Sequence, residues 1–348
     1  MKILHCDSRR DEIQKTVYSC GEFAYEYISD FARNLPDNVG QCQYCGRLYR
    51  SGRKCLSGYA RKSQPDREAG TRWDVYERIW RGTAGRLPAF IKYTPQNTIL
   101  CTDTHNHIVR EFDTDGTLIR DFGEAGKPSD TGMDMGTLAR MRRDGKIFPT
   151  EPYLGIVGMW AFYEAQRRVK RVAGPFNMPT DVDMTSSGEY IFADGYGNRA
   201  VHIFNADGTY RKTFGGVGDW EKPYEDTPGD MLIVHALCVD ARDHIWICDR
   251  EKDAVHVFDT DGNVVGYCSN NMGMPSGVDT DGEYIYVVGR AGYLTVFDLD
   301  MNMVAQLGTF NSDLRAHDLA ANKQGDLFLF PTHANEDHQV IKLRRIRK

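Results

Sequence analysis

The chain reads Met178-Pro-Thr-Asp-Val-Asp183, then Glu189-Tyr-Ile-Phe-Ala-Asp194, Ala200-Val-His-Ile-Phe204 and Arg211-Lys-Thr-Phe-Gly215 between residues 178 and 215. Short alternating segments of this kind, separated by turn residues, are typical of β-strands. The Asp207-Gly208 pair before the last segment is a hairpin signal, because glycine supplies the positive φ of such a turn. This stretch therefore predicts one four-stranded antiparallel sheet.

The same order of segments returns along the chain. Clear copies begin at Val234-His-Ala-Leu-Cys-Val-Asp240 and Met274-Pro-Ser-Gly-Val-Asp279, and weaker copies begin at Leu87-Pro88 and Arg315-Ala-His-Asp-Leu319. Each copy has the sequence form of a propeller blade, and repetition at a fixed period predicts a repeat architecture. We therefore expect an all-β protein that folds as a β-propeller.

Two parts of the chain depart from the repeat. The interval from Asp103 to Asp194 is more than twice the interval from Asp249 to Gly289. We interpret residues 123–177, which hold a helix-compatible stretch at 159–168, as an insertion over one face; a degenerate blade is the alternative. Residues 1–75 do not fit the repeat, and we expect them to form an irregular or helical N-terminal extension that packs on a propeller of residues 76–348. A strand near residues 75–80 would help to close the ring.

Composition excludes several classes of partner. The net charge of -6 and a pI near 5.9 argue against a nucleic-acid partner, which requires clustered cationic charge. No apolar run approaches the roughly 18 residues of a membrane span, so no membrane partner is expected. The nine scattered cysteines favour reduced thiols and a cytoplasmic location. The oligomeric state stays open.

Residues at equivalent positions of different blades lie on one ring around the central channel. Polar residues that differ between blades at such a position should therefore meet at one mouth of the propeller. The loops after the second strands carry His105, Tyr196, Arg250, Arg290 and His333, and the starts of two first strands carry His235 and His317. This cluster indicates a metal or an anionic ligand. The alternative is a solvated channel whose histidines are satisfied by backbone carbonyls.

Other polar residues repeat with the blades and are assigned to structure. Asp183, Asp240 and Asp279 recur at the end of each first strand and are predicted to cap turns. His202 and His256 share one position in third strands and are predicted to pack the blades. A structural zinc site at Cys20, Cys42, Cys45 and Cys55 is the alternative to free thiols in the N-terminal region.

Five segments carry a resemblance to a known family. They are Pro179-Thr-Asp-Val, Ala193-Asp-Gly-Tyr-Gly-Asn-Arg199, Val234-His-Ala-Leu, Cys248-Asp-Arg-Glu251 and Ala316-His-Asp-Leu319. On these residues the chain resembles the NHL-repeat propellers, and within them the peptidyl-α-hydroxyglycine α-amidating lyases. The resemblance implies six blades and a zinc-dependent lyase that cleaves the C–N bond of an N-acylated carbinolamine, releasing an amide and an aldehyde acid.

The resemblance also implies roles for individual residues. Tyr196 matches the catalytic tyrosine, Arg250 and Arg81 match active-site arginines, His235 and His317 match two of three zinc histidines, and Asp318 matches a structural-calcium carboxylate. The remaining zinc histidine of the family follows Leu-Pro, but here Leu87-Pro88 leads into Ala89-Phe90. His105 is the expected replacement, because it follows Asp103 at the offset that separates Tyr196 from Asp194; His333 is the second choice.

These observations predict a metal-assisted lyase or hydrolase that acts on a small polar, anionic substrate. Zinc held by His235, His317 and a third imidazole would act as a Lewis acid. Tyr196, its pKa lowered by the cation and by Arg250, would be the base, and Arg250 or Arg290 would pair with a substrate carboxylate. The alternatives are a non-catalytic NHL propeller that binds a protein or ligand, and a lactonase or esterase-type propeller hydrolase.

Overall fold

The strands form sheets with simple antiparallel connections in chain order. The structure, a computed structural model, describes residues 17–28, 39–42, 47–50, 54–56, 90–134, 136, 163–269, 271–331 and 340–347. Four successive segments of the chain each form a four-stranded sheet, and the strands of each sheet are neighbours in sequence. Pairing between consecutive strands requires only the local alternation and the hairpin turns that the repeat contains.

The four sheets have the following bounds. The first contains β6 (Ile91–Tyr93), β7 (Ile99–Asp103), β8 (Ile108–Phe112) and β9 (Leu118–Phe122), with the 3-10 turn η3 (Thr104–Asn106) after β7. The second contains β10 (Asp181–Met184), β11 (Tyr190–Asp194), β12 (Ala200–Phe204) and β13 (Tyr210–Phe214). The third contains β16 (Val234–Val239), β17 (Ile245–Asp249), β18 (Ala254–Phe258) and β19 (Val264–Ser269). The fourth contains β20 (Pro275–Thr280), β21 (Tyr284–Gly289), β22 (Tyr293–Asp298) and β23 (Met303–Gly308).

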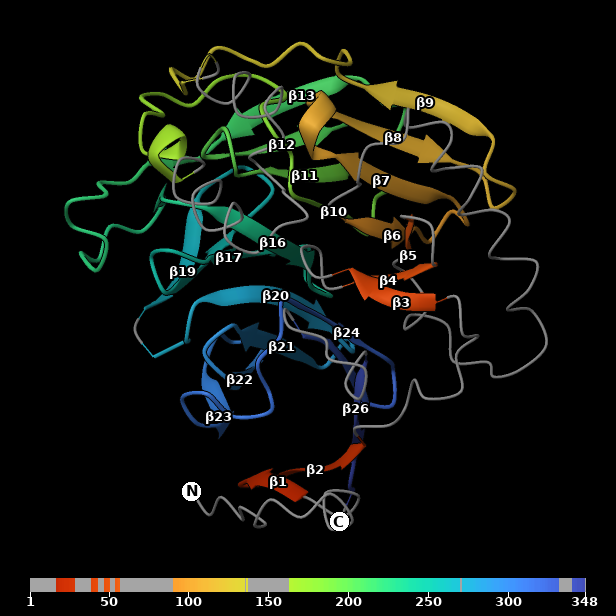
Figure 1. The fold of residues 1–348 in the computed structure, drawn as a ribbon, viewed down its shortest axis with the longest axis vertical. Helices are drawn as coiled ribbons and strands as arrows, with labels where there is room; N and C mark the ends of the chain where they lie inside the picture. The colour runs from red at the N-terminus through yellow and green to blue at the C-terminus, as the bar shows by residue number, and fades with distance from the viewer. Residues whose placement is uncertain are drawn as a thin grey trace.

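The sheets are arranged as the blades of a propeller. Their first strands contact one another in order, β6 with β10, β10 with β16, β16 with β20, and β20 with β24. Figure 1 shows these first strands toward the middle of the molecule and β9, β13 and β23 toward its rim. Buried apolar residues fill the spaces between successive blades, so the core is a series of interblade layers. The predicted all-β propeller is confirmed.

The last blade joins the two ends of the described chain. It contains β24 (Asp318–Ala321), β25 (Leu327–Phe330) and β26 (Ile341–Arg345), followed by β2 (Phe23–Ile28) and β1 (Val17–Cys20) as its outer strands. β2 pairs antiparallel with β26, with Tyr27 opposite Leu343, and both side chains are buried. Residues 17–28 therefore belong to the propeller and correct the assignment of all of residues 1–75 to an extension. The expected closing strand near 75–80 lies outside the described residues.

A further sheet comes from the same N-terminal region. It contains β3 (Val39–Cys42), β4 (Arg47–Arg50) and β5 (Lys54–Leu56), paired antiparallel. Figure 1 draws this sheet between β6 and β24. With it, the described residues form six sheets of three or more strands, as the six-bladed prediction requires. The two-stranded parallel pair β14 (Gly216–Val217) and β15 (Asp230–Met231) connects the second blade to the third.

The predicted insertion at residues 123–177 agrees with the contacts between the two blades that flank it. The blades on either side of it touch directly: Thr104 Oγ1 donates to the carbonyl of Pro179 at 2.7 Å, and Lys92 forms an ion pair with Asp183. A hidden blade would have to separate them. The described parts of the segment, 123–134 and 163–177, contain no strand, and residues 163–166 form a helical turn. Within the described part of the chain, no helix has the length and apolar character of a membrane span.

The repeated aspartates join blades more than they cap turns. Asp183 accepts from the Val239 N–H at 3.1 Å, and Asp279 accepts from the Ala321 N–H at 3.0 Å; each donor lies on the next blade. Asp240 alone of the three caps its own turn, accepting from the N–H of Arg242 and of His244. The turn-cap prediction is therefore confirmed for Asp240, and Asp183 and Asp279 form bonds between blades that it did not include.

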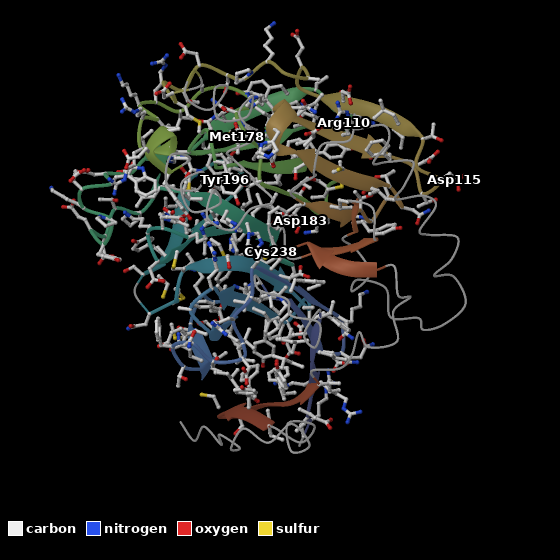
Figure 2. The ribbon with its side chains drawn as sticks, in the orientation of Figure 1. Arg110, Asp115, Met178, Asp183, Tyr196 and Cys238 are labelled. Carbon is white, nitrogen blue, oxygen red and sulfur yellow. The ribbon has the colours of Figure 1, made fainter. Side chains whose placement is uncertain are left out.

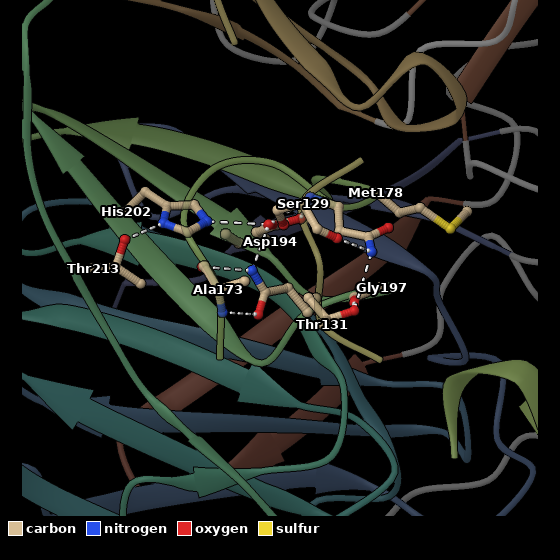
Figure 3. Close-up of polar contacts among 12 residues, drawn as sticks. Ser129, Thr131, Ala173, Met178, Asp194, Gly197, His202 and Thr213 are labelled. Atoms are coloured by element: carbon tan, nitrogen blue, oxygen red, sulfur yellow. Dashed lines mark hydrogen bonds and ion pairs between the residues drawn. The ribbon is translucent and has the colours of Figure 1, made fainter. Parts of the chain in front are cut away.

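A second aspartate position closes the second and third blades from within, at Asp194 and Asp249. Figure 3 shows Asp194 at the end of β11, where it accepts from the Asn177 N–H at 2.7 Å and from the Asn198 side chain at 3.0 Å. His202 Nε2 lies 3.1 Å from the same carboxylate, and His256 Nε2 lies 3.5 Å from Asp249. Both imidazoles are fully buried, so their predicted role in blade packing is confirmed.

Candidate functional site

His235 presents a free ring nitrogen in a buried place. It lies at a β-bulge in β16, and its Nδ1 is 2.7 Å from the carbonyl oxygen of Ser276. Because a carbonyl only accepts, Nδ1 carries the proton. Nε2 is buried and has no hydrogen-bond partner among the residues that the structure describes. Burial, and then the charges of Arg250 and His317, hold the pKa of His235 well below 6.5, so the imidazole is a neutral base.

The bond to Ser276 is part of a ring of interblade bonds. At the equivalent positions, Thr180 Oγ1 donates to the carbonyl of Val234 at 2.7 Å, and Ser276 Oγ donates to that of Ala316 at 3.0 Å. A hydroxyl therefore performs the structural task at these positions. The imidazole of His235 is larger than these hydroxyl side chains. Its Nδ1 makes the interblade bond, and its second nitrogen, Nε2, is not used by that bond.

Two further rings meet His235 across the channel. His317, which comes just before β24, has its ring centroid 4.7 Å from that of His235, with the planes at 75°. Phe90, which comes just before β6, lies 5.9 Å from His235 and 6.4 Å from His317 by ring centroids. Phe90 is buried; its N–H donates to Thr102 Oγ1 at 2.7 Å, and its carbonyl accepts from the Thr102 N–H at 2.9 Å. An apolar ring thus occupies the place facing the two imidazoles.

Tyr196 reaches His235 because its loop lies directly against β16. A Cβ added to Gly195 would lie 1.7 Å from the carbonyl oxygen of Val234, so only glycine permits this approach. The ring of Tyr196 meets that of His235 edge to face at 5.8 Å. Burial raises the pKa of Tyr196 and outweighs the opposing charge of Arg250. Among the described residues, the charge of Arg250 alone does not lower the pKa of Tyr196, so the phenol stays protonated at neutral pH.

Arg250 holds a permanent positive charge beside the phenol. Its guanidinium lies 5.8 Å from the ring centre of Tyr196, its Nε donates to Glu251 at 2.8 Å, and its Nη2 donates to the Tyr163 hydroxyl at 3.3 Å. Burial pulls the pKa of Arg250 down, but the Glu251 carboxylate and the two phenols outweigh it, so the pKa lies above its ordinary value.

The insertion covers this group of residues. Ala165 and Val169 of the insertion pack with Met178, and Tyr196 packs against the same cluster (Figure 2). The fully buried Arg199 ties the insertion down, because its Nη2 donates to the Gln166 carbonyl at 2.8 Å. Its Nη1 donates to the Gly195 carbonyl at 2.8 Å. Burial lowers the pKa of Arg199 to about 10.

The other predicted site residues have different positions. Arg290 is half-buried, and its charge contributes to lowering the pKa of His235. Asp318 is half-buried and accepts from the N–H of Leu319 at 2.8 Å. His105 lies half-buried in η3. Arg81, His333, Cys45 and the side chains of Cys42 and Cys55 lie outside the described residues, and Cys20 is a free thiol.

The described residues supply two of the three protein ligands that a catalytic zinc ion requires. His235 has the arrangement of a metal ligand, with one nitrogen donating to a carbonyl and the other without a partner among the described residues. No group of three His, Cys, Asp or Glu that could hold a metal ion occurs in the described part of the chain, and Phe90 faces the pair. Among the described residues the donor set is therefore incomplete for zinc, and the carboxylate of Asp318 belongs to no described group that could hold calcium.

Sequence reasoning missed three residues here. The third zinc histidine was expected at position 89, and Phe90 is the next residue. An alignment of the repeats shifted by one residue would have identified Phe90. Tyr163 and Gln166 come from the insertion, which has no repeat to index it. Only the folded chain places them near Arg250 and Arg199.

Comparisons with known proteins give a general likeness. No family model and no curated protein matches the chain. Similar solved structures include the WD40 β-propeller domain of Doa1, with 9% identity and a TM-score of 0.47 over 75% of this chain and 64% of that chain. Virginiamycin B lyase from Staphylococcus aureus has 9% identity and a TM-score of 0.45 over 74% of this chain and 80% of that chain. A catalytically inactive variant of that enzyme, solved with quinupristin, has 9% identity and a TM-score of 0.46 over 93% and 100%. Likeness at this level carries no information about function, and the fold follows from the strand pairing itself.

Proposed function

We propose that the chain is a lyase that acts at the propeller mouth on a small anionic substrate by acid–base catalysis. The observation that carries the proposal is the contact between a buried, neutral imidazole and a half-buried, protonated phenol. Among the described residues Nε2 of His235 has no hydrogen-bond partner, and the ring centroid of Tyr196 lies 5.8 Å from that of His235. The resemblance to amidating lyases supplies the substrate class, an N-acylated carbinolamine that carries a carboxylate.

The reaction follows from the protonation states. His235 Nε2 removes the proton of the substrate hydroxyl, the C–O bond becomes a carbonyl, and the C–N bond breaks. The hydroxyl of Tyr196 donates its proton to the departing amide nitrogen, and the proton held by His235 then returns to Tyr196. Arg250 and Arg290 pair with the substrate carboxylate and keep it beside the two rings. The products are a primary amide and an aldehyde acid.

The test is release of glyoxylate and benzamide from α-hydroxyhippurate. Removing the phenol hydroxyl in Tyr196→Phe should lower kcat about 100-fold or more, since general acid–base groups contribute on that scale. Tyr210→Phe, at an exposed position of β13, is the matched control and should keep the wild-type rate. Wild-type protein that releases no glyoxylate above the buffer rate, or a fully active Tyr196→Phe variant, would refute the lyase.

A chelator separates this mechanism from a zinc-assisted one. Because the described residues provide two imidazoles and no third ligand, activity should survive dialysis against EDTA. Activity that is lost on chelation and restored by zinc would instead support a third ligand from outside the described residues. His333→Ala would then be the next variant to assay for zinc content.

A further inference from the structure

Gln166 carries a buried side-chain amide that has no hydrogen-bond partner among the described residues. It is fully buried in the helical turn of the insertion. Among the described residues, it is the one side chain in which both polar atoms, Nε2 and Oε1, are buried without a hydrogen-bond partner. An amide in this condition is costly unless some group satisfies it.

Its neighbours place Gln166 beside the proposed active site. Tyr163, three residues earlier and therefore on the same side of the helical turn, accepts from Arg250 at 3.3 Å. Arg199 donates to the backbone carbonyl of Gln166 at 2.8 Å. Arg199 Nε and Glu251 Oε2 are also buried without partners in the part of the chain that the structure describes. Unpaired donors and acceptors thus gather where the insertion meets the loops of the second and third blades.

The chemistry of a glutamine side chain selects its complement. Its amide offers one acceptor and two donors. A carboxylate or phosphate would leave Oε1 facing another acceptor, and an apolar group would leave both atoms unpaired. A primary carboxamide presents a carbonyl oxygen and an N–H on the same edge, so it can accept from Nε2 and donate to Oε1 at once.

We propose that Gln166 binds a primary carboxamide, the group that the proposed lyase releases. The identification of this carboxamide as the reaction product rests on the proposed function. In a trans secondary amide, carbon replaces the hydrogen that lies on the carbonyl side of the nitrogen. The edge that carries both the carbonyl oxygen and an N–H therefore exists only after the C–N bond breaks. Gln166 would bind the released primary amide more tightly than the uncleaved substrate.

Benzamide and N-methylbenzamide test the assignment, because they differ at that one hydrogen. Isothermal titration of wild-type protein should show benzamide binding at least tenfold more tightly, since the methyl analogue leaves Oε1 unpaired. Gln166→Met, which keeps the length of the side chain, should remove the difference, and Gln324→Met at an exposed position should keep it. Gln166→Glu, which lacks the Nε2 donor, should also remove it and serves as a second variant if the first does not fold.

Three results would overturn the assignment: equal affinities for the two compounds, no binding of benzamide at millimolar concentration, or a preference that persists in both Gln166 variants. The outcomes also separate the two proposals. Selective benzamide binding without glyoxylate release refutes only the lyase. Glyoxylate release without amide selectivity refutes only the role of Gln166.

Discussion

Phe90 lies edge to face against His235, with ring centroids 5.9 Å apart and planes at 81°. The same phenyl ring is stacked near His317 at 6.4 Å. A residue that faces two imidazoles from a third blade holds the place where a third metal ligand would stand. The residue at position 90 therefore decides whether this place can hold a metal ion: a phenyl ring offers no ligand, whereas an imidazole would.

Phe90→His should create a zinc site. A third imidazole would complete a three-ligand set with His235 and His317 and leave a fourth position open. We expect the purified variant to retain about one zinc ion per chain by elemental analysis, and its thermal midpoint to rise when zinc is added. Phe90→Leu is the control and should bind no zinc. Stoichiometric zinc in the wild-type protein would show that a further ligand besides His235 and His317 comes from outside the described residues.

Two substitutions at His235 separate its structural and chemical roles. Asn has a side-chain N–H at the position of Nδ1, so His235→Asn should keep the bond to Ser276 and lose the base. His235→Ala should lose both, at an added cost of about 1 kcal/mol for the hydrogen bond and more for the cavity. Turnover should fall about 100-fold or more in both variants, while urea denaturation should show a large loss of stability only in the alanine variant. Wild-type turnover in His235→Asn would exclude His235 as the base.

The pH dependence of the rate should show a broad plateau. The pKa of His235 lies well below 6.5 and that of Tyr196 lies above 10.0, so the base is deprotonated and the acid is protonated across neutral pH. The rate should therefore fall only below pH 6.5 on the acid side. A profile whose midpoint lies at or above pH 6.5 would contradict the burial of His235.

The same lowered pKa links folding to pH. The unfolded chain binds a proton at His235 near pH 6.5, whereas the folded chain resists it. The contribution of His235 to stability is therefore complete above pH 6.5 and declines as the pH falls from there toward the lowered pKa. His235→Asn should reduce the slope of thermal midpoint against pH in this window. An unchanged slope would assign the acid sensitivity to other groups.

Gly195→Ala should disturb the fold and the site together. The Cβ of the new alanine would lie 1.7 Å from the Val234 carbonyl oxygen. To relieve this clash, either the loop that carries Tyr196 or strand β16 must move. We expect a loss of about 1–3 kcal/mol in urea denaturation and a marked fall in turnover. Gly174→Ala, which would have no atom within 4 Å of its new Cβ, is the matched control. A stable and active Gly195→Ala variant would show that the loop can shift without consequence.

Much of this protein can be derived from its sequence because a blade is built from local pairings. Strand alternation, hairpin glycines and their repetition predicted the four blades of residues 91–308, the insertion before β10, and the equivalence of His235 with His317. The pairing of β2 with β26 could not be predicted in this way. It joins distant parts of the chain, and neither partner carries a repeat that marks the other.

Chemistry at the mouth was decided by the tertiary structure. The sequence determined that imidazoles, a phenol and guanidiniums occur at equivalent positions of the repeat. It did not determine that Phe90, one residue beyond the sought histidine, would face them, because that depends on the pairing of Phe90 with Thr102. Nor did it determine that the pKa of Tyr196 would be raised, because desolvation by the packed insertion outweighs the nearby charge of Arg250. Periodicity is a local property of the chain, whereas register, burial and the pKa values that follow from them arise only when the blades and the insertion pack together.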